Sequence, residues 1–364
     1  MMNKNEWKKV KLGDVCKIVS GSTPKTHVKE YWNGNINWLT PAEVKENEII
    51  IYNTERKITE KAVKDTNLKL LPKGTVILSS RAPIGKIAIA GTKMYCNQGF
   101  KNLICSEKIY SLYLYYFLKK KKIFLNSLGR GATFKEISKT IVENIEITLP
   151  NYEEQIYISK IFNNLDNILK LKQQQLFEFE KLVKFQFLKM FGDPILNTLN
   201  FPTKKVIEVI KLQRGFDLPI NQRNRKGNIS VFGANGILGF HDEAKKNFGI
   251  ITGRSGTLGE VYISEKPFWP LNTTLFSIDT YENNIIYLKY LLIFYDLKRF
   301  SSGTGVPTLN RNILHDKEII SVPIELQNKF ADFVKQVDKS KVELQKSIDE
   351  TQLLFDSLMD KYFG

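Results

Sequence analysis

Two long segments of this chain carry the same helical pattern, and they align with each other without a gap over most of their length. The first runs from Leu149 to Gly192 and the second from Val322 to Gly364. Three matches anchor the alignment: Gln155 with Gln327, Asp166 with Asp338, and Phe191-Gly192 with Phe363-Gly364. An internal repeat of this length predicts a duplicated fold rather than two unrelated surface helices.

Each segment has an apolar stripe that recurs every seven residues. The stripe residues are Leu169, Leu176, Val183 and Met190 in the first segment and Val337, Leu344, Thr351 and Leu358 in the second. A helix with such a stripe must bury it against a partner, so the pattern predicts that the two helices pair as an antiparallel coiled coil. Gly192, followed by Pro194, predicts the end of the first helix.

The remaining sequence repeats as well. Residues 1–148 and 193–321 each read as short strands, turns and a short helix, and each precedes one long helix. The turn at Arg81 aligns with the turn at Arg254, and Gly129-Arg130-Gly131 aligns with Gly303-Thr304-Gly305. Within residues 1–148, Asn33-Gly34 predicts a turn between aromatic strand residues.

We therefore predict an α+β fold with an internal pseudo-two-fold repeat. Two globular α/β units at residues 1–148 and 193–321 are separated by two long helices at residues 149–192 and 322–364. The polar loops of the two globular units differ from each other, whereas the scaffold positions repeat.

Several classes of protein do not fit the composition. No apolar run reaches the ~18 residues that a membrane span needs, and the first residues lack the apolar core of a signal peptide. The three cysteines, Cys16, Cys96 and Cys105, are too few and too scattered for a disulfide framework. We expect a cytoplasmic protein with reduced thiols and no membrane partner.

The charge points towards a polyanion. Lys and Arg together number 54 against 38 Asp and Glu, which gives a formal net charge of +16. Such an excess favours nucleic acid as a partner, and anionic membrane second. A lysine-rich solvated surface is the alternative interpretation of the same numbers.

No catalytic or metal motif is apparent. The glycine-rich stretch from Gly253 to Gly259 has the spacing of neither a phosphate-binding loop nor a dinucleotide-binding loop, so it reads as a tight turn. The histidines His27, His241 and His315 have no cysteine or carboxylate at ligand spacing. An amino-methyltransferase tetrapeptide is also absent. We expect no catalytic residue, no metal and no cofactor in this chain.

Polar and basic residues in the glycine-rich loops are the candidate DNA-binding residues. They are Lys25, Arg81, Lys86, Gln98, Arg130, Thr133, Arg223, Asn224, Arg225, Arg254 and Thr304. Arg, Lys, Asn and Gln read base edges, whereas Ser, Thr and Lys often hold phosphates. Each residue alone is also compatible with a solvated surface. Trp32, Trp38 and Trp269 are candidates either for base stacking or for core packing.

The arrangement resembles the DNA specificity subunit of type I restriction–modification systems over the whole chain. The resemblance rests on Leu12-Gly13-Asp14-Val15 with Gly21, on Gly85-Lys86-Ile87-Ala88 and on Asn97-Gln98. It rests above all on two helix openings, Leu149-Pro150 with Gln155 and Val322-Pro323 with Gln327. Each of these long helices then ends in Phe-Gly.

This resemblance implies two target recognition domains, each reading one half of a bipartite, asymmetric double-stranded DNA site. It implies that the helices set the gap between the halves and dock two methyltransferase subunits. Those subunits bind S-adenosylmethionine and modify adenine, and motor-nuclease restriction subunits complete the complex. The specificity subunit itself has no catalytic activity.

Two other hypotheses remain open at this point. One is an enzyme that carries its own recognition domains, which DNA cleavage or methyl transfer by the purified chain would reveal. The other is a coiled-coil scaffold whose two globular units bind protein or another ligand without DNA specificity. Salt-sensitive DNA binding separates this scaffold from a DNA reader.

Overall fold

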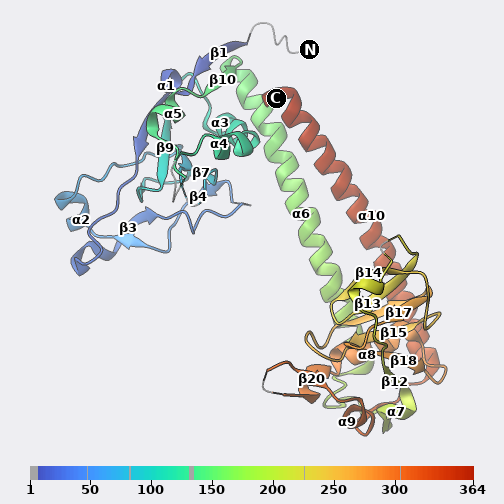
Figure 1. The fold of residues 1–364 in the computed structure, drawn as a ribbon. Helices are drawn as coiled ribbons and strands as arrows, with labels where there is room; N and C mark the ends of the chain where they lie inside the picture. The colour runs from blue at the N-terminus through green and yellow to red at the C-terminus, as the bar shows by residue number, and fades with distance from the viewer. Residues whose placement is uncertain (1–6, 47, 82, 131–134, 225, 304) are drawn as a thin grey trace. The chain divides into compact units, whose positions relative to one another are not determined.

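The computed structural model describes residues 7–46, 48–81, 83–130, 135–224, 226–303 and 305–364. The chain divides into two compact units (Figure 1). The first unit holds residues 1–173 and 346–364, and the second holds residues 174–345. Each unit combines one globular body with part of each long helix. The four-part division into two recognition domains and two helices remains a prediction.

The first unit contains ten strands and five short α-helices in its described residues. The strands are β1 (Lys8–Lys11), β2 (Cys16–Ser20), β3 (Trp32–Leu39), β4 (Ile50–Ile51), β5 (Lys57–Ile58), β6 (Val76–Ser79), β7 (Ile87–Ala90), β8 (Tyr95–Cys96), β9 (Phe100–Cys105) and β10 (Glu146–Leu149). The helices are α1 (Leu12–Val15), α2 (Glu60–Asp65), α3 (Ser111–Lys120), α4 (Lys122–Ser127) and α5 (Lys139–Glu143).

The second unit repeats this order. Its strands are β11 (Thr203–Lys205), β12 (Lys211–Arg214), β13 (Ile229–Gly233), β14 (Gly236–His241), β15 (Gly249–Gly253), β16 (Val261–Ser264), β17 (Phe268–Pro270), β18 (Thr274–Asp279), β19 (Ser301–Ser302), β20 (Thr308–Leu309) and β21 (Glu318–Ile320). Its short helices are α7 (Val206–Val209), α8 (Ile285–Phe294) and α9 (Arg311–His315).

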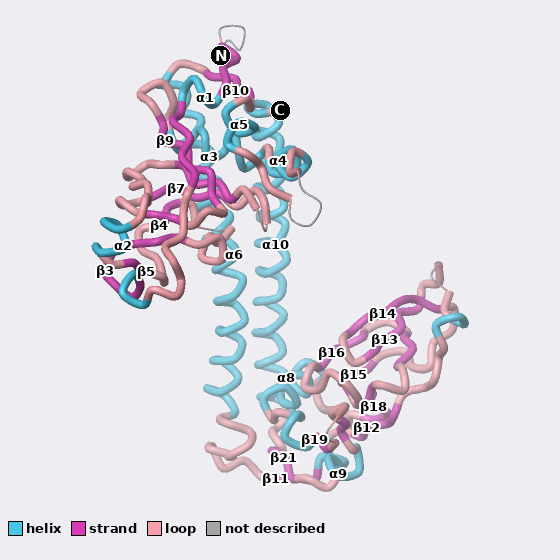
Figure 2. Tube along the Cα trace, turned by 60° about the vertical axis from the view of Figure 1, so that its left-hand side comes forward, coloured by secondary structure: helices cyan, strands magenta, loops and turns pink. Residues whose placement is uncertain are grey.

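The sheets of the two units correspond to each other. The main sheet has the order β2-β9-β6-β7-β4 in the first unit and β12-β18-β15-β16 in the second. A three-stranded sheet accompanies each, β5-β3-β8 and β14-β13-β17, and each unit also has a two-stranded pair, β1-β10 and β11-β21. The second unit has one further pair, β19-β20. In both units, long loops connect these strands (Figure 2). The duplicated topology confirms the repeat and the α+β class predicted from the sequence.

The core of each unit joins its main sheet to the long helices. In the first unit, Leu78 and Leu103 of the sheet belong to the same apolar cluster as Tyr113 of α3 and Phe162 and Phe355 of the long helices. The second unit repeats this arrangement around α8. The heptad stripe is therefore buried partly against the globular body and partly against the other helix.

The long helices are α6 (Tyr152–Phe191) and α10 (Ile324–Phe363), each of 40 residues. Asn151 caps α6, because its side-chain oxygen accepts a hydrogen bond from the Glu154 N–H at 2.9 Å. Gly192 ends the helix at φ +69°, a conformation that favours glycine, and an added Cβ would overlap Thr198 Oγ1. Within the first unit the two helices are antiparallel, since Phe162 meets Phe355 and Lys172 meets Ser347.

Two buried glutamines attach the helices to their units in the same way. Gln155 accepts a hydrogen bond from the Tyr110 N–H at 2.8 Å, and its amide donates to the carbonyl oxygen of Pro150 at 3.0 Å. Gln327 accepts one from the Asn284 N–H at 2.9 Å and donates to the carbonyl oxygen of Val322 at 2.8 Å. Each amide therefore ties the first turn of a long helix to the loop that precedes α3 or α8.

One local prediction is wrong. Asn33-Gly34 is not a turn between two strands, because β3 runs through it from Trp32 to Leu39. Asn33 has φ +62°, and the pairing with β5 shifts register between Trp32 and Ile36. The Asn-Gly pair thus lies in a β-bulge or similar irregularity of the pairing, where its left-handed preference is accommodated.

Among the helices that the structure describes, none is both long enough and apolar enough to cross a membrane. The same residues contain no group of three or more His, Cys, Asp or Glu side chains placed to hold a metal ion.

Candidate nucleic-acid interface

Predicted site residues of the first unit lie at one edge of its main sheet because of the directions in which its strands run. Both β2 and β6 run antiparallel to β9, and Ser20 lies opposite Lys101 as Ser79 lies opposite Phe100. The loops that leave β2 and β6 therefore meet the turn that enters β9. We call the described residues of 22–28, 80–86, 97–99 and 129–137 the first loop edge.

Hydrogen bonds join these loops to one another. The Thr23 hydroxyl donates to the side-chain oxygen of Gln98, which links the loop of Lys25 to the turn before β9. The Ser80 N–H donates to the Gly99 carbonyl oxygen at 2.7 Å. Arg81 follows Ser80 directly, so its turn lies beside that of Gln98.

The segment that carries Arg130 lies against the same turn. Arg130 and Glu136 exchange two main-chain hydrogen bonds, at 3.0 and 2.9 Å, and Arg81 also forms a β-bridge with Glu136. Arg81 is half-buried and Arg130 is exposed. The structure thus brings Lys25, Arg81, Gln98 and Arg130 to one edge of the first unit.

A cleft of about 590 Å³ opens at this edge. Its lining includes Arg81, Asn97 and Gly99 of the first loop edge, and the other lining residues are Thr40, Pro41, Ala42, Glu43, Lys45, Glu55 and Arg56. Lys86 lies beside the cleft, because its ammonium group donates to the Pro41 carbonyl oxygen at 2.8 Å. This bond makes Lys86 a support of the cleft wall as well as a source of positive charge.

Sequence reasoning missed Arg56, a cation that lines this cleft. Its guanidinium lies 4.6 Å from the ring centroid of Trp32 and 5.2 Å from that of Trp38, which is typical of a cation–π contact. Trp38 is only 1% exposed, so it is a core residue, whereas Trp32 is half-buried. The charged run from Glu55 to Lys57 was the available signal, but nothing local distinguishes it from a solvated loop.

The second unit forms the equivalent second loop edge from the described residues of 216–228, 254–259, 271–273 and 303–308. The ends of β12 and β15 again meet the start of β18, with Arg214 opposite Leu275 and Gly253 opposite Thr274. Arg254 comes directly after β15, and the Leu309 N–H donates to its carbonyl oxygen at 2.8 Å. The arrangement of the loops is therefore duplicated.

Main-chain hydrogen bonds show that Arg81 and Arg254 do not occupy equivalent positions. The Ser80 N–H donates to the Gly99 carbonyl oxygen, and the Arg254 N–H donates to the Thr273 carbonyl oxygen at 2.8 Å. Because Gly99 and Thr273 both directly precede the central strand, Arg254 corresponds to Ser80. The alignment of the two arginines from the sequence is wrong by one residue.

The true counterpart of Arg81 is Ser255. Each forms a β-bridge with the returning loop, Arg81 with Glu136 and Ser255 with Thr308. In an extended segment, a shift of one residue reverses the side on which a side chain lies. Arg254 is instead held by its own loop edge, since its guanidinium donates to the Asn272 carbonyl oxygen at 3.1 Å.

The two other described candidates in the second unit form hydrogen bonds that hold their loop in place. The Arg223 guanidinium donates twice to the Leu218 carbonyl oxygen, at 3.2 Å each. The Asn224 amide donates to the Asp242 carboxylate at 3.0 and 3.1 Å. Thr133, Arg225 and Thr304 lie outside the described residues. Trp269 is 7% exposed and packs in the core.

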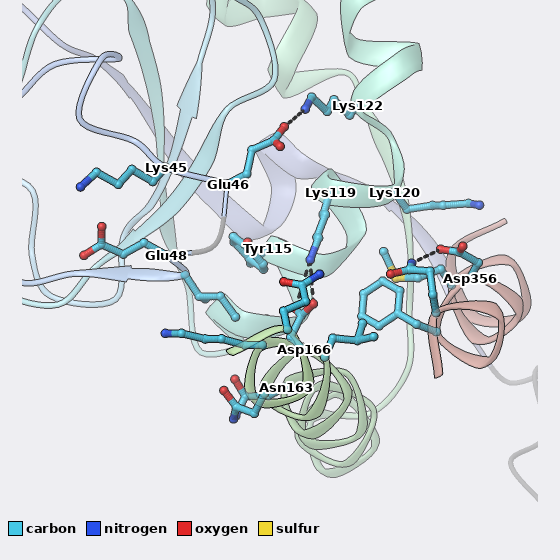
Figure 3. Close-up of a pocket in the computed structure, with 18 of the residues that line it drawn as sticks. Lys45, Glu46, Glu48, Tyr115, Lys119, Lys120, Lys122, Asn163, Asp166 and Asp356 are labelled. Atoms are coloured by element: carbon cyan, nitrogen blue, oxygen red, sulfur yellow. Dashed lines mark hydrogen bonds and ion pairs between the residues drawn. The ribbon is translucent and has the colours of Figure 1, made fainter. Parts of the chain in front are cut away.

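A second and larger hollow in the first unit, of about 870 Å³, has a different character (Figure 3). It is lined by side chains of α3, α4, α6 and α10, together with Lys45, Glu46, Glu48, Ile49 and Ile50. Two of its lysines are paired with carboxylates of the same lining: Lys119 pairs with Asp166 at 3.0 Å, and Lys122 pairs with Glu46 at 2.5 Å. This internal pairing makes it a poorer anion-binding surface than the first loop edge.

The fold defines a class of proteins with two repeated α+β units, each of which carries a loop edge and precedes a long helix. The family model for the type I restriction modification DNA specificity domain matches residues 4–181 and 199–351, which is most of the chain. The chain belongs to this family.

Similarity to individual proteins extends over almost the full length. The type I restriction enzyme MjaIX specificity subunit of Methanocaldococcus jannaschii is 30% identical over 98% of this chain and 92% of its own length. The S subunit of a type I restriction–modification system from M. genitalium has the same fold, with a TM-score of 0.64 and 18% identity over 100% of this chain and 98% of that chain. A chain from a structure of type I R-M complex assembly gives 0.64 at 16% identity, covering 98% and 97%.

Proposed function

We propose that this chain is the non-catalytic DNA specificity subunit of a type I restriction–modification complex. Each unit reads one half of a bipartite, asymmetric site in double-stranded DNA. The observation that carries the proposal is the duplicated loop edge. The same strand ends display loops in both units, but the side chains on them differ.

The side chains at the loop edges have the chemistry that DNA recognition needs. Arginine reads guanine through two parallel hydrogen bonds, and glutamine or asparagine reads adenine in the same manner. In the first unit we assign base or phosphate contacts to Lys25, Arg81, Lys86, Gln98, Arg130 and, from the sequence alone, Thr133. In the second we assign them to Arg223, Asn224 and Arg254 and, from the sequence alone, to Arg225 and Thr304.

The different placement of the arginines supports an asymmetric site. Arg81 has no arginine at its structural equivalent, Ser255, and Arg254 has none at Ser80. The two units therefore do not present the same pattern of donors to DNA. We expect the two half-sites to differ in sequence.

The remaining parts of the proposal concern partners. The long helices α6 and α10 dock two methyltransferase subunits, which bind S-adenosylmethionine, and motor-nuclease restriction subunits join the complex. The assembly works in the cytoplasm, where its DNA substrate lies. The chain contributes recognition and supplies no catalytic group of its own.

The proposal is tested by sequencing the methylome of cells that express this chain with its neighbouring methyltransferase subunit. A bipartite adenine-methylated motif that disappears when the chain is deleted is the expected result. The Arg81→Ala variant should relax one half-motif and the Arg254→Ala variant the other, each by about 1–3 kcal/mol of discrimination.

Lys73 provides a matched control. It is an exposed lysine in the turn that enters β6, so it lies at the opposite end of that strand from Arg81. The Lys73→Ala variant should leave both half-motifs unchanged. If the assembled complex methylates no motif and binds DNA without a salt-dependent affinity, a protein-binding scaffold becomes the better interpretation.

A further inference from the structure

A buried lysine lies beneath the first loop edge. Lys101, in β9, has a side chain that is only 8% exposed. Its ammonium group donates to a Glu136 carboxylate oxygen at 2.9 Å and lies 3.4 Å from the Ser80 hydroxyl oxygen. A buried ammonium is costly unless it is paired and hydrogen-bonded, so this lysine depends on Glu136.

Glu136 in turn connects the two arginines of the edge, Arg81 and Arg130. Its main chain is hydrogen-bonded to that of Arg130 in both directions and forms a bridge with that of Arg81. The hydrogen bond from Lys101 lowers the pKa of the Glu136 carboxyl, and the Arg81 charge lowers it further. The carboxylate is therefore ionised at neutral pH and held in one place.

The second unit lacks this pair. Strand register places Leu275 at the position of Lys101, since Leu275 lies opposite Thr252 as Lys101 lies opposite Leu78. The bridge to Ser255 places Thr308 at the position of Glu136. An ion pair is thus replaced there by a leucine and a threonine.

The second unit has a cation at a different position of its loop edge. Arg254, at the position of Ser80, reaches the Asn272 carbonyl oxygen with its own guanidinium. In the first unit the cation comes from the central strand and is buried. In the second it comes from the loop itself and is half-buried.

We propose that Lys101 and Glu136 are positioning residues for DNA recognition by the first unit: Lys101 anchors Glu136, and Glu136 fixes the main chains of Arg81 and Arg130. The inference rests on the proposed function, because it concerns how those arginines meet a half-site. Neither Lys101 nor Glu136 needs to touch DNA.

The sign of the effect separates positioning from electrostatics. Removing a carboxylate from a basic edge raises the local positive charge, which by itself tightens binding to phosphates. If Glu136 positions the arginines, the Glu136→Gln variant should instead lose about tenfold in discrimination within the half-motif that Arg81→Ala relaxes. The other half-motif then serves as an internal control.

The experiment measures binding of the complete methyltransferase complex to duplexes with single substitutions in each half-motif, over a range of salt concentrations. The variants are Glu136→Gln, Glu136→Asp, Lys101→Leu with Glu136→Thr, and Arg81→Ala. The double variant copies Leu275 and Thr308 of the second unit, so it removes the buried charge and is expected to fold. The double variant should keep its stability but lose discrimination in the first half-motif. Glu136→Asp, which keeps a carboxylate, should retain more of this discrimination than Glu136→Gln.

Two results would overturn the inference. One is a Glu136→Gln complex that binds more tightly with unchanged discrimination. The other is a double variant that recovers both stability and discrimination, which would make the pair purely structural. A wild-type complex that discriminates at no position would instead contradict the proposed function.

Discussion

In both units the long helices pack on the globular body, but a phenylalanine pair between α6 and α10 lies at a different position along the helices in each unit. In the first unit, Phe162 of α6 packs on Phe355 of α10, with ring centroids 5.4 Å apart. The repeat aligns these positions with Val334 and Val183 in the second unit. Both valines are buried in the core of that unit.

In the second unit, the corresponding phenylalanine pair lies at the neighbouring position along the two helices. Phe187 and Phe330 lie 5.4 Å apart there, and the aligned residues of the first unit are Met359 and Ile158. A core keeps its stability when side-chain volume is moved but conserved. The comparison teaches that aligned positions in a repeat share a backbone but not a packing role.

The largest expected effect comes from removing one of these aromatic residues. Phe162→Ala should destabilise the first unit by about 3–5 kcal/mol, because it leaves a cavity among Tyr116, Phe355 and Phe363. Urea unfolding gives the free energy, and hydrogen exchange shows which unit opens. Tyr157→Ala, at an exposed position of α6, is the control. If both variants lost the same free energy of unfolding, Phe162 would not be the packed core residue that this comparison assigns.

The buried glutamines come next. Gln155→Met and Gln327→Met should each cost on the order of 3 kcal/mol, since each leaves a main-chain N–H and two oxygen atoms without partners. Hydrogen exchange should localise the first loss to α3 and the second to α8. Gln173→Met, at an exposed position of α6, should be nearly neutral. A Gln155→Met chain as stable as this control would contradict an equivalent role for the two amides.

The ion pair of Asp166 should contribute less. Lys119 and Asp166 are about a third and a fifth exposed, so a double-mutant cycle with Lys119→Met and Asp166→Asn should give a coupling of about 1 kcal/mol or less. The Tyr116 hydroxyl also donates to Asp166, at 2.9 Å, and it keeps an acceptor in the asparagine variant. The exposed pair Lys61–Glu30 should show no measurable coupling. A coupling as large as the effect of Gln155→Met would overturn this ranking.

At neutral pH, the smallest difference in stability between the two units should come from His315, which aligns with Glu143 in the first unit. His315 accepts a hydrogen bond from the Leu212 N–H at 3.0 Å. Burial lowers the pKa of His315, and the charges of Arg311 and Lys211 lower it further. The unfolded chain then takes up a proton first as the pH falls below about 6.5, so the second unit should lose stability there and nowhere above.

Urea unfolding at pH 7.5 and pH 5.5 tests this difference. His315→Gln keeps a neutral acceptor and should remove the acid-dependent part of the loss, whereas His27→Gln, in an exposed loop, should not. An unchanged pH dependence in the His315→Gln chain would assign the effect to other groups.

The sequence predicted the parts of this fold that depend on local periodicity. The seven-residue stripe gave both long helices, and the repeat gave the order of strands in the second unit once the first had been read. Asn33-Gly34 shows the limit of a local signal. A left-handed preference fits a turn or a bulge, and the pairing of β3 with β5, more distant in the chain, selects between them.

The sequence predicted which loops form the candidate site, but it did not predict how their residues contact one another. The loops of Arg81, Gln98 and Arg130 were identified from their glycines and charges, and strand order explains why they meet. Arg56, Lys101 and Glu136 were missed, because their roles depend on partners that are far away in sequence. Glu136, for example, contacts Lys101 across 35 positions.

The sequence by itself determined the duplication, the long helices and the basic character of the loops, since each of these is written in residue order, spacing and composition. Only the tertiary structure decided that Arg254 corresponds to Ser80, that Lys101 is buried against Glu136, and that the phenylalanine pairs lie at different positions along the helices. These features depend on hydrogen-bond register and on close packing. Both are set by contacts between distant segments, and a shift of one residue changes them while leaving the sequence pattern almost the same.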